Sequence, residues 1–416
     1  MVMKRNVKLL GSVAMLSIAL ASCATDELKE VYQGEKISFT TRMTRAVETT
    51  TDNLQEFRVY ADVDGYNMFI NGDTARRDKS SAGNTFYTDK SYFWPSGVEK
   101  MKFWAYAPTD IVKEEQVKIN FEGQKFTDFA PDNDITKQKD FVVAYNEVEW
   151  KSTSGMSVAL TFKHALSQIE VKAHCPGSDN KRIYIKGAWI VNVYGKADLT
   201  FDPNSSTHLD WKFKDEIQNN SFYGTQWTVN TDDYLKVKDT DKSDANNLLT
   251  AGVDTRNLML LPQQVSAYEF AEKEGEEDKV GGYILLLCRV EAWHTGGVHV
   301  GGTKDPLVEE GTDQHIHQLF PITEKYNKEA YGYTCVPVAF AWEAGKKYIY
   351  NLEFCGHKSG AGVYPPSLPD GLPTGDNIIK DIPEGKKNGD PVLDDPIHFE
   401  VDVEGWTGST EDKPMQ

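Results

Sequence analysis

Short runs in which apolar and polar residues alternate recur along the whole chain and restrict what it can fold into. Clear cases are residues 57–63, 142–145, 169–171, 183–185 and 348–354, which are rich in Val, Ile, Tyr and Phe. Successive side chains of a strand point to opposite faces, so each run predicts a strand. No window of a dozen residues has the apolar stripe of an amphipathic helix. Many short strands separated by Gly, Asn, Asp and Pro indicate an all-β chain built of β-sandwiches.

Residues 1–22 have the layout of a signal peptide. Lys4 and Arg5 precede an apolar run from Val7 to Leu20, and small residues end this run before Cys23. A positive start, a short apolar core and small residues are typical of a secretory leader. The residues before Cys23 resemble the lipobox of bacterial lipoproteins, so Cys23 is expected to become the lipidated first residue of a precursor.

A strand-like segment follows soon after Cys23. In an extended conformation one face would carry Ile37, Phe39, Thr41 and Met43, and two basic residues, Arg42 and Arg45, lie at its end. If this strand fills a sheet edge, cutting beside it would release it and leave unpaired backbone groups. Residues 23–45 are therefore interpreted as a lipidated propeptide with a removable strand. The alternative is that both arginines belong to a solvated start of the mature chain.

The expected domain boundary is a polar break at residues 151–155. It predicts an N-terminal β-sandwich over 46–153 and a C-terminal one over 156–355. Residues 356–396 contain seven Pro and seven Gly with almost no apolar pattern, which predicts an extended, poorly packed tether. Residues 397–416 begin with one more alternating strand, whose apolar face carries Ile397, Phe399, Val401 and Val403. Such a strand is a candidate donor strand for another subunit.

The chain is acidic, with a formal net charge of −18 at pH 7. This charge disfavours nucleic acid and anionic membranes as partners, so contact with a membrane is expected only through the lipid of the precursor. No nucleophile elbow, phosphate-binding loop or dinucleotide fingerprint appears in context. We therefore expect neither an enzyme nor a cofactor.

Four cysteines follow Cys23, and two of them flank an expected hairpin. A turn at Gly345 would set Cys335 opposite Cys355. Export places both in an oxidising compartment, where cross-strand neighbours can form a disulfide. A disulfide and a pair of reduced, half-buried thiols are both left open.

Several other groupings have a functional and a structural interpretation. Four histidines crowd one region (His294, His299, His315 and His317), and residues 239–244 begin like a calcium loop. Neither has the complete ligand spacing of a known site, so no metal site is predicted. An aromatic group could stack on sugars, but its strand period favours the core: Trp94, Phe103, Trp104 and Tyr106. His164 lies within an amphipathic strand, which favours a structural role.

Six phrases, in this order and spacing, resemble the fimbrillin family of the Bacteroidales, the type V pilins. They are Tyr-Phe-Trp-Pro-Ser-Gly at 92–97, Met-Lys-Phe-Trp-Ala-Tyr-Ala-Pro at 101–108, Lys-Asp-Phe-Val-Val-Ala at 139–144, the segment 160–171, Leu-Met-Leu-Leu-Pro-Gln at 258–263, and Trp-Glu-Ala-Gly-Lys-Lys-Tyr-Ile-Tyr at 342–350. The resemblance implies two transthyretin-like Greek-key β-sandwiches in tandem.

The resemblance also implies a life cycle. A lipoprotein precursor reaches the outer membrane, an arginine-specific protease cuts it, and subunits polymerise by strand exchange into a surface fimbrium. The family's Thr-Arg-Ala context corresponds to the bond between Arg45 and Ala46, with Arg42 and Met43 as second choice. Expected partners are other pilin subunits, the protease, and host or bacterial surface ligands. The alternative function is a lipid-anchored surface glycan-binding protein, and stalk, tip and anchor roles stay open.

Overall fold

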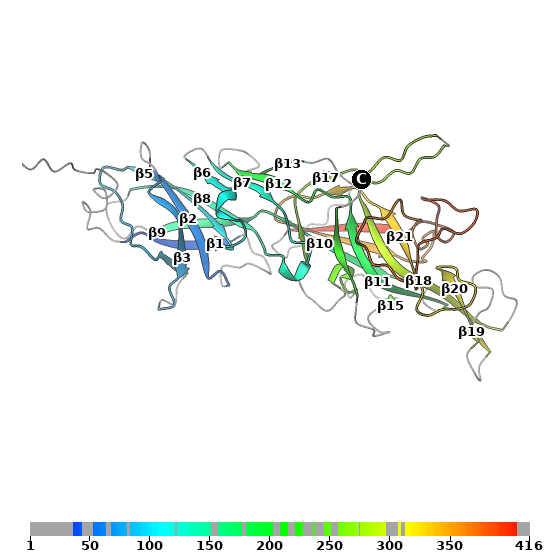
Figure 1. Cartoon of the computed structure of the whole chain (residues 1–416). Helices are drawn as coiled ribbons and strands as arrows, with labels where there is room; N and C mark the ends of the chain where they lie inside the picture. Colours follow the sequence, from blue (N-terminus) through cyan, green and yellow to red (C-terminus); the bar gives the residue numbers. More distant parts are fainter. Residues whose placement is uncertain are drawn as a thin grey trace, which may run out of the picture.

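The computed structural model describes residues 36–43, 53–63, 68–80, 84–120, 123–150, 157–176, 180–202, 209–214, 221–227, 236–237, 245–250, 257–273, 275–296, 307–308 and 313–405. Apart from short 3₁₀ turns at Glu114–Gln116 (η1), Ile135–Lys137 (η2) and Leu248–Thr250 (η4), every element in these ranges is a strand. The predicted all-β fold is therefore confirmed. Among these residues, no helix has the length and apolar character needed to cross a membrane. Figure 1 shows two β-rich bodies, with the blue and cyan strands in one and most green to red strands in the other.

The N-terminal body is a β-barrel whose strands pair in a closed ring. In ring order they are β1 (Ser38–Met43), β4 (Thr85–Thr88), β3 (Ile70–Arg77), β2 (Glu56–Val63), β5 (Lys100–Ala107), β8 (Val142–Glu149) and β9 (Ser157–His164). Neighbours are antiparallel except β1 and β9, which run parallel from Ser38 opposite Ser157 to Met43 opposite Phe162. The first described strand of the chain therefore closes the ring.

The core of the barrel follows from the alternation of its strands. In β9 the side chains of Val158, Leu160 and Phe162 are buried in the barrel, and the residues between them are exposed. In β5, by contrast, Phe103 faces the barrel core while Trp104 on the other face is also fully buried. A strand with both faces buried needs a second layer outside it.

That second layer is a four-stranded sheet whose strands come from two separate stretches of the chain, 117–129 and 197–213. Its order is β13 (Leu209–Phe213), β12 (Ala197–Phe201), β7 (Gln124–Phe129) and β6 (Val117–Ile119). The ring of Phe201 in β12 packs edge-on against Trp104, with ring centroids 5.6 Å apart, and Phe126 in β7 packs against Tyr106 at 5.2 Å. This sheet joins the two bodies because β7 and β12 pair directly.

The C-terminal body is built of two larger sheets. One has the order β16 (Leu258–Leu260), β10 (Ser167–His174), β23 (Lys346–Glu353) and β25 (His398–Gly405). The other contains β14 (Phe222–Gln226), β11 (Lys181–Val191), β18 (Tyr283–Thr295), β20 (Gln314–Phe320) and β19 (Leu307–Val308), with β15 (Lys236–Val237), β21 (Tyr331–Pro337) and β24 (Ile378–Ile379) as branches. A small sheet pairs β17 (Gln264–Val265) with β22 (Phe340–Ala341).

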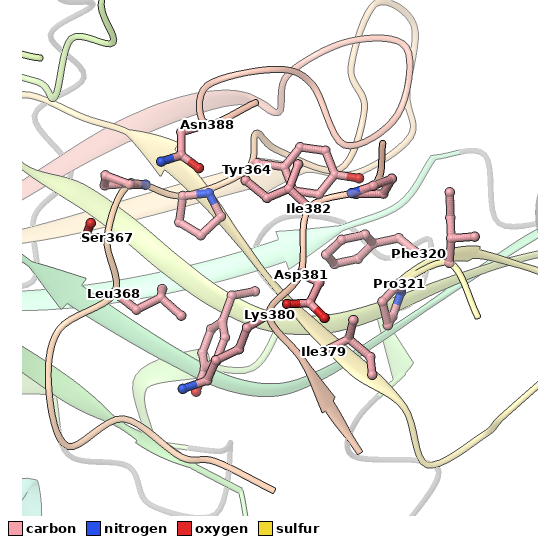
Figure 2. A pocket seen from close by; sticks show the side chains of 15 residues that line it. Phe320, Pro321, Tyr364, Ser367, Leu368, Ile379, Lys380, Asp381, Ile382 and Asn388 are labelled. Atoms are coloured by element: carbon pink, nitrogen blue, oxygen red, sulfur yellow. The ribbon is translucent and has the colours of Figure 1, made fainter. Parts of the chain in front are cut away.

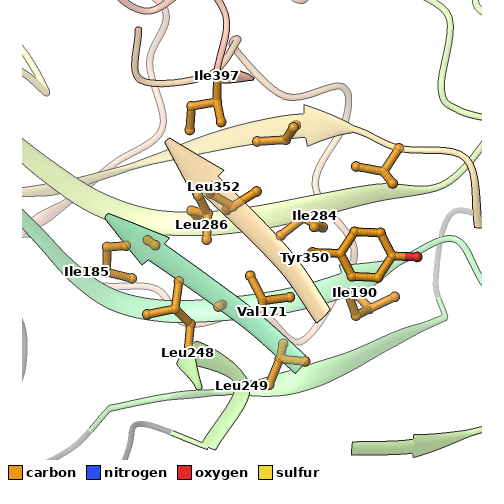
Figure 3. Close-up of a cluster of buried hydrophobic side chains, with 14 of the residues drawn as sticks. Val171, Ile185, Ile190, Leu248, Leu249, Ile284, Leu286, Tyr350, Leu352 and Ile397 are labelled. Atoms are coloured by element: carbon orange, nitrogen blue, oxygen red, sulfur yellow. The ribbon is translucent and has the colours of Figure 1, made fainter. Parts of the chain in front are cut away.

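The core of this body lies between its two large sheets. Figure 3 shows Val171, Tyr350 and Leu352 from the four-stranded sheet close to side chains of the larger one, such as Ile185, Ile284 and Leu286. Ile397, which directly precedes β25, belongs to the same cluster and is 6% exposed. The last strand is therefore part of the core packing of its own chain.

The predicted boundary between 153 and 156 is wrong. β9 begins after the polar break but pairs with β1 and β8 in the N-terminal barrel, so that barrel extends to His164. β10, which starts at Ser167, is the first strand of the C-terminal body. The break separates two neighbouring barrel strands and is not a linker between domains.

The predicted tether at 356–396 is also wrong, because this segment is packed on the C-terminal body. Val363 exchanges two backbone hydrogen bonds with Cys335 in β21, of 2.9 and 3.0 Å. The side chains of Ala361, Tyr364 and Val392 are buried. Gly362 has a φ of 91°, and a Cβ there would lie 2.3 Å from Oγ1 of Thr334, so only glycine allows this close approach.

The predicted hairpin that pairs Cys335 with Cys355 does not form. Cys335 lies in β21 of the larger sheet, whereas the chain reaches Cys355 after β23, which pairs with β10 and β25. The two side chains belong to different hydrophobic clusters, and all four described cysteines are buried thiols without a disulfide. Of the two states left open, the disulfide is thus absent from this structure.

We expect the thiols to remain free in the exported protein. Burial raises the pKa of the Cys335 and Cys355 thiols, which lowers the thiolate fraction that disulfide exchange needs. Alkylation in denaturant without reductant should label Cys175, Cys288, Cys335 and Cys355, as measured by peptide mass spectrometry. A reduced sample is the control for complete labelling, and recovery of a Cys335–Cys355 cross-linked peptide would contradict the expectation.

Candidate assembly site: the first and last strands

β1 presents one face to the barrel core, as the alternation predicts. Ile37 and Phe39 are fully buried, Thr41 is 4% exposed, and Met43 is partly buried against the same cluster. The ring of Phe39 makes edge contacts with Phe57 at 6.0 Å and Phe103 at 5.9 Å between centroids. These contacts place the first strand at the centre of the packing of the barrel.

The backbone of β1 is held on both sides. Along one edge it pairs with β9 over its whole length, and along the other it pairs with β4 at Phe39 and Thr40. The N–H of Ile37 donates to the carbonyl of Tyr92 at 2.8 Å, and the side chain of Asn84 donates to the carbonyl of Thr41. The strand was expected to fill a sheet edge; it instead closes the ring between β4 and β9.

Of the two predicted cleavage bonds, one lies within the described residues. The side chain of Arg42 is exposed, but its backbone is opposite Thr161 in the ladder of β1 and β9, and Met43 is opposite Phe162. Arg45 and Ala46 lie outside the described residues, and so does the predicted lipidation site, Cys23.

β25 is the edge strand of its sheet. It runs antiparallel to β23 from His398 opposite Glu353 to Gly405 opposite Lys346, and it pairs with no other described strand. The four predicted donor-strand anchors share the inner face, as expected: Ile397 is buried, and three others are partly buried against the core, namely Phe399, Val401 and Val403. The outer face has exposed, polar His398, Glu400 and Asp402.

The two strands have the same apolar spacing although they lie in different bodies of the chain. The inward side chains of the first segment are Ile37, Phe39, Thr41 and Met43. Those of the last segment are Ile397, Phe399, Val401 and Val403. Both segments begin Ile-x-Phe. The next two inward side chains are Thr and Met in the first segment and Val and Val in the last, so both segments suit a similar row of pockets.

The other groupings are largely structural. The aromatic set proposed as core is buried, at 2% exposure or less for Trp94, Phe103 and Trp104 and 3% for Tyr106. His164 is buried beside Asp140, with its Nδ1 2.9 Å from the carboxylate. This pair holds the end of β9 to the residues just before β8, which agrees with the structural role.

The histidines of β18 and β20 meet as a pair. His294 donates from Nδ1 to the carbonyl of Gly296 at 2.6 Å, and its Nε2 lies 3.2 Å from Nε2 of His317. This is a hydrogen-bond distance between two nitrogens. No group of three metal-ligating side chains occurs among the described residues, and His299 and the loop 239–244 lie outside them.

Sequence reasoning missed the ring closure by β1 and the sheet shared by both bodies. The unbroken apolar run of β5 is a signal for the second feature, since it indicates burial on both faces. Ring closure has no such signal, because the partner β9 is far away in the sequence.

The described part of the chain is thus all-β, with two bodies that a shared sheet joins. A family model described as fimbrillin-like matches residues 44–277. The chain therefore belongs to the fimbrillin-like family, as the sequence resemblance indicated.

Two solved structures are similar to this chain over most of their length. A fimbrial protein from Bacteroides vulgatus is similar over 90% of this chain and 100% of its own, at 16% identity and a TM-score of 0.50. A proposed cell adhesion protein from Parabacteroides distasonis is similar over 89% of this chain and 99% of its own, at 11% identity and a TM-score of 0.43. At 16% identity, the similarity to the first of these structures supports the fold alone. No curated protein sequence matches the chain.

Proposed function

We propose that this chain is a non-enzymatic structural and adhesive subunit of a type V pilus. It is exported as a precursor lipidated at Cys23, is held at the outer membrane by this lipid, and is cut by an arginine-specific protease. It then polymerises at the cell surface by exchange of β-strands. The observation that carries the proposal is β1, the first described strand, which closes a barrel, contains Arg42 and ends two residues before Arg45.

The position of β1 favours Arg45 over Arg42 as the cleaved residue. A protease binds its substrate as an extended strand, so several residues on each side of the cut must leave any existing sheet. Arg42 and Met43 are both paired with β9, whereas Arg45 comes two residues after Met43, the last residue of β1. Cutting at Arg45 therefore requires less disruption of the barrel, and it also separates β1 and the lipid from the rest of the chain.

Loss of β1 prepares the barrel for another strand. Without it, β4 and β9 each have an edge with unpaired N–H and C=O groups, which is a template for strand addition. The side chains of Phe57 and Phe103 lose their contact with Phe39 and become the floor of an apolar groove. A strand with apolar residues at every second position would restore both the hydrogen bonds and the core.

β25 of another subunit is the proposed replacement. It matches β1 in spacing, and it pairs on one side only, so fewer backbone hydrogen bonds hold it in place. Each anchor that becomes fully buried contributes about 1.5–3 kcal/mol, so four anchors make a strong joint between subunits. Within one chain β1 and β25 belong to different bodies, which favours exchange between chains.

The test is substitution of the two arginines. We expect the double variant Arg42→Ala/Arg45→Ala to remain a lipid-bound monomer, because β1 stays in the barrel and the groove never opens. Arg45→Ala alone should behave in the same way, and Arg42→Ala alone should assemble and start at Ala46. N-terminal sequencing and SDS-resistant ladders on gels measure both outcomes. Fibres from the double variant would exclude the cleavage mechanism.

A further inference from the structure

A hollow of about 390 Å³ lies on the C-terminal body, where the end of β20 meets the segment 364–388. Figure 2 shows Phe320 and Pro321 at one side, Tyr364, Ser367 and Leu368 from a second stretch, and Ile379 to Ile382 from a third. Its volume is at the lower end of the range for small-molecule sites, roughly 300–1,000 Å³. It is separate from β1 and β25, none of whose residues lines it.

The walls of the hollow are fixed before any ligand arrives. The backbone of Tyr364 accepts from Gly389 at 2.8 Å and donates to Asp390 at 3.0 Å. β24 pairs with β21, so Ile379 is held opposite Gly332. The hydroxyl of Tyr333 donates to the carbonyl of Pro373 at 2.9 Å. A preformed site avoids the entropic cost of ordering its loops on binding.

The floor of the hollow is apolar. The rings of Phe320 and Tyr364 pack edge to face with centroids 6.1 Å apart, and both residues are 4% exposed. Pro365 and Pro366 are buried beside them. At the margin Ile322 is 53% exposed, which is unusual for a large apolar side chain in this molecule. Above the covered rings, the half-buried side chains of Leu368, Ile379 and Ile382 and the exposed Ile322 offer aliphatic surface to a ligand that has one apolar face.

The rim of the hollow is polar. Four exposed side chains from different stretches border it: Ser367, Lys380, Asp381 and Asn388. Among the described residues, none of these four side chains forms a hydrogen bond or ion pair. A hydroxyl, an ammonium, a carboxylate and an amide together offer both donors and acceptors. One positive and one negative charge leave the rim without a net charge.

We propose that this hollow binds a neutral hexose unit at the end of a surface glycan. The C–H face of a pyranose ring fits the apolar floor, and its hydroxyl groups fit the mixed donors and acceptors of the rim. Asp381 and Asn388 are assigned the hydroxyl contacts, and Ile322 offers an apolar surface to a methyl or acetamido group. The proposal rests on the adhesive role proposed above and gives it a ligand class.

A proline-rich peptide fits the same hollow less well. Grooves for such peptides present aromatic rings to the ligand, whereas the rings here are almost fully covered, with Tyr333 at 3% exposure. The groups that reach solvent are the aliphatic side chain of Ile322 and the polar side chains of the rim. The rim has one positive and one negative charge, so it does not attract an anionic sugar more strongly than a neutral one.

The test uses the full, unprocessed chain as a monomer. Saturation-transfer NMR against the methyl glycosides of glucose, galactose, mannose and N-acetylglucosamine identifies a bound sugar, and calorimetry with its disaccharides gives the affinity. We expect at least one to bind. Asp381→Asn should weaken its binding about tenfold, as for loss of a hydrogen bond to a charged group, and Asn388→Ala about threefold to tenfold, as for loss of a neutral one. Asp370→Asn is the control, since Asp370 is exposed but does not line the hollow.

The outcomes are distinct. Absence of binding by every glycoside, equal affinity of Asp381→Asn and the unmodified chain, or binding of a Pro-Pro peptide in place of sugars overturns the proposal. Because all three side chains are exposed, circular dichroism should show an unchanged fold in each variant. Binding is measured on a monomer that has not been cut, so failure here leaves the arginine test of assembly unaffected, and failure of assembly leaves this measurement intact.

Discussion

A disulfide that joins β25 to β23 is expected to abolish fibre assembly while it is oxidised. The register sets Glu353 opposite His398 on the outer face of the sheet. Directly opposite residues have Cβ atoms about 4.5–5.5 Å apart, close enough for a disulfide after a small adjustment. In the variant Glu353→Cys/His398→Cys, β25 is covalently held in its own sheet and cannot be donated to a neighbouring barrel.

The same variant provides its own control. Reduction should restore assembly to the level of the single variants Glu353→Cys and His398→Cys, and SDS-resistant ladders before and after reduction measure the difference. The native thiols interfere little, since all four described cysteines are buried and burial raises the pKa of Cys288 and Cys335. Normal fibres from the fully oxidised double variant would exclude β25 as the donor strand.

Strands with strict alternation could be predicted from the sequence because their pattern is local. β9 buries every second residue and β25 partly buries every second residue, and the sequence shows which face that is. The same holds for Ile37 and Phe39, whose inward direction was expected and is observed. For these elements the periodicity alone specifies burial.

The packed conformation of residues 356–396 could not be predicted, because their apolar residues do not recur at a regular spacing. Their fixed path depends on single apolar contacts, such as Val392, and on backbone hydrogen bonds to distant residues, such as Val363 to Cys335. A composition rich in Pro and Gly does not distinguish such a segment from a free linker. The same limit explains the wrong hairpin, since β21 and β23 are consecutive long strands but belong to different sheets.

The candidate assembly site was only partly accessible to sequence reasoning. The terminal motifs identified the two strands, but pairing between β1 and β9 joins residues separated by more than a hundred positions. The hollow beneath Ser367 and Asp381 is assembled from the end of β20, from Tyr333 in β21 and from parts of the segment 364–388. Neither feature has a local signal, because both depend on the tertiary arrangement.

The second large effect concerns Phe39, which is expected to stabilise the uncut precursor but not the assembled fibre. Its ring is fully buried and contacts Phe57 and Phe103. Replacing a buried Phe by Ala costs about 3–5 kcal/mol, because transfer energy is lost and a cavity remains. Phe39→Ala should therefore lower the urea midpoint of the uncut chain strongly. Thr40→Ala, on the other face of β1 and only partly buried, is the matched control and should have a small effect.

Processing should remove this effect. If cleavage at Arg45 takes β1 away, the assembled subunit no longer contains residue 39, and fibres from Phe39→Ala should be as stable as fibres of the unmodified chain. Phe57→Ala should destabilise both forms, because Phe57 lies in β2 and stays in the barrel, where it also contacts Phe86 and Phe162. Urea unfolding of the precursor and of the assembled fibre distinguishes the two variants. A Phe39→Ala fibre as weak as the Phe57→Ala fibre would mean that β1 stays in place after assembly.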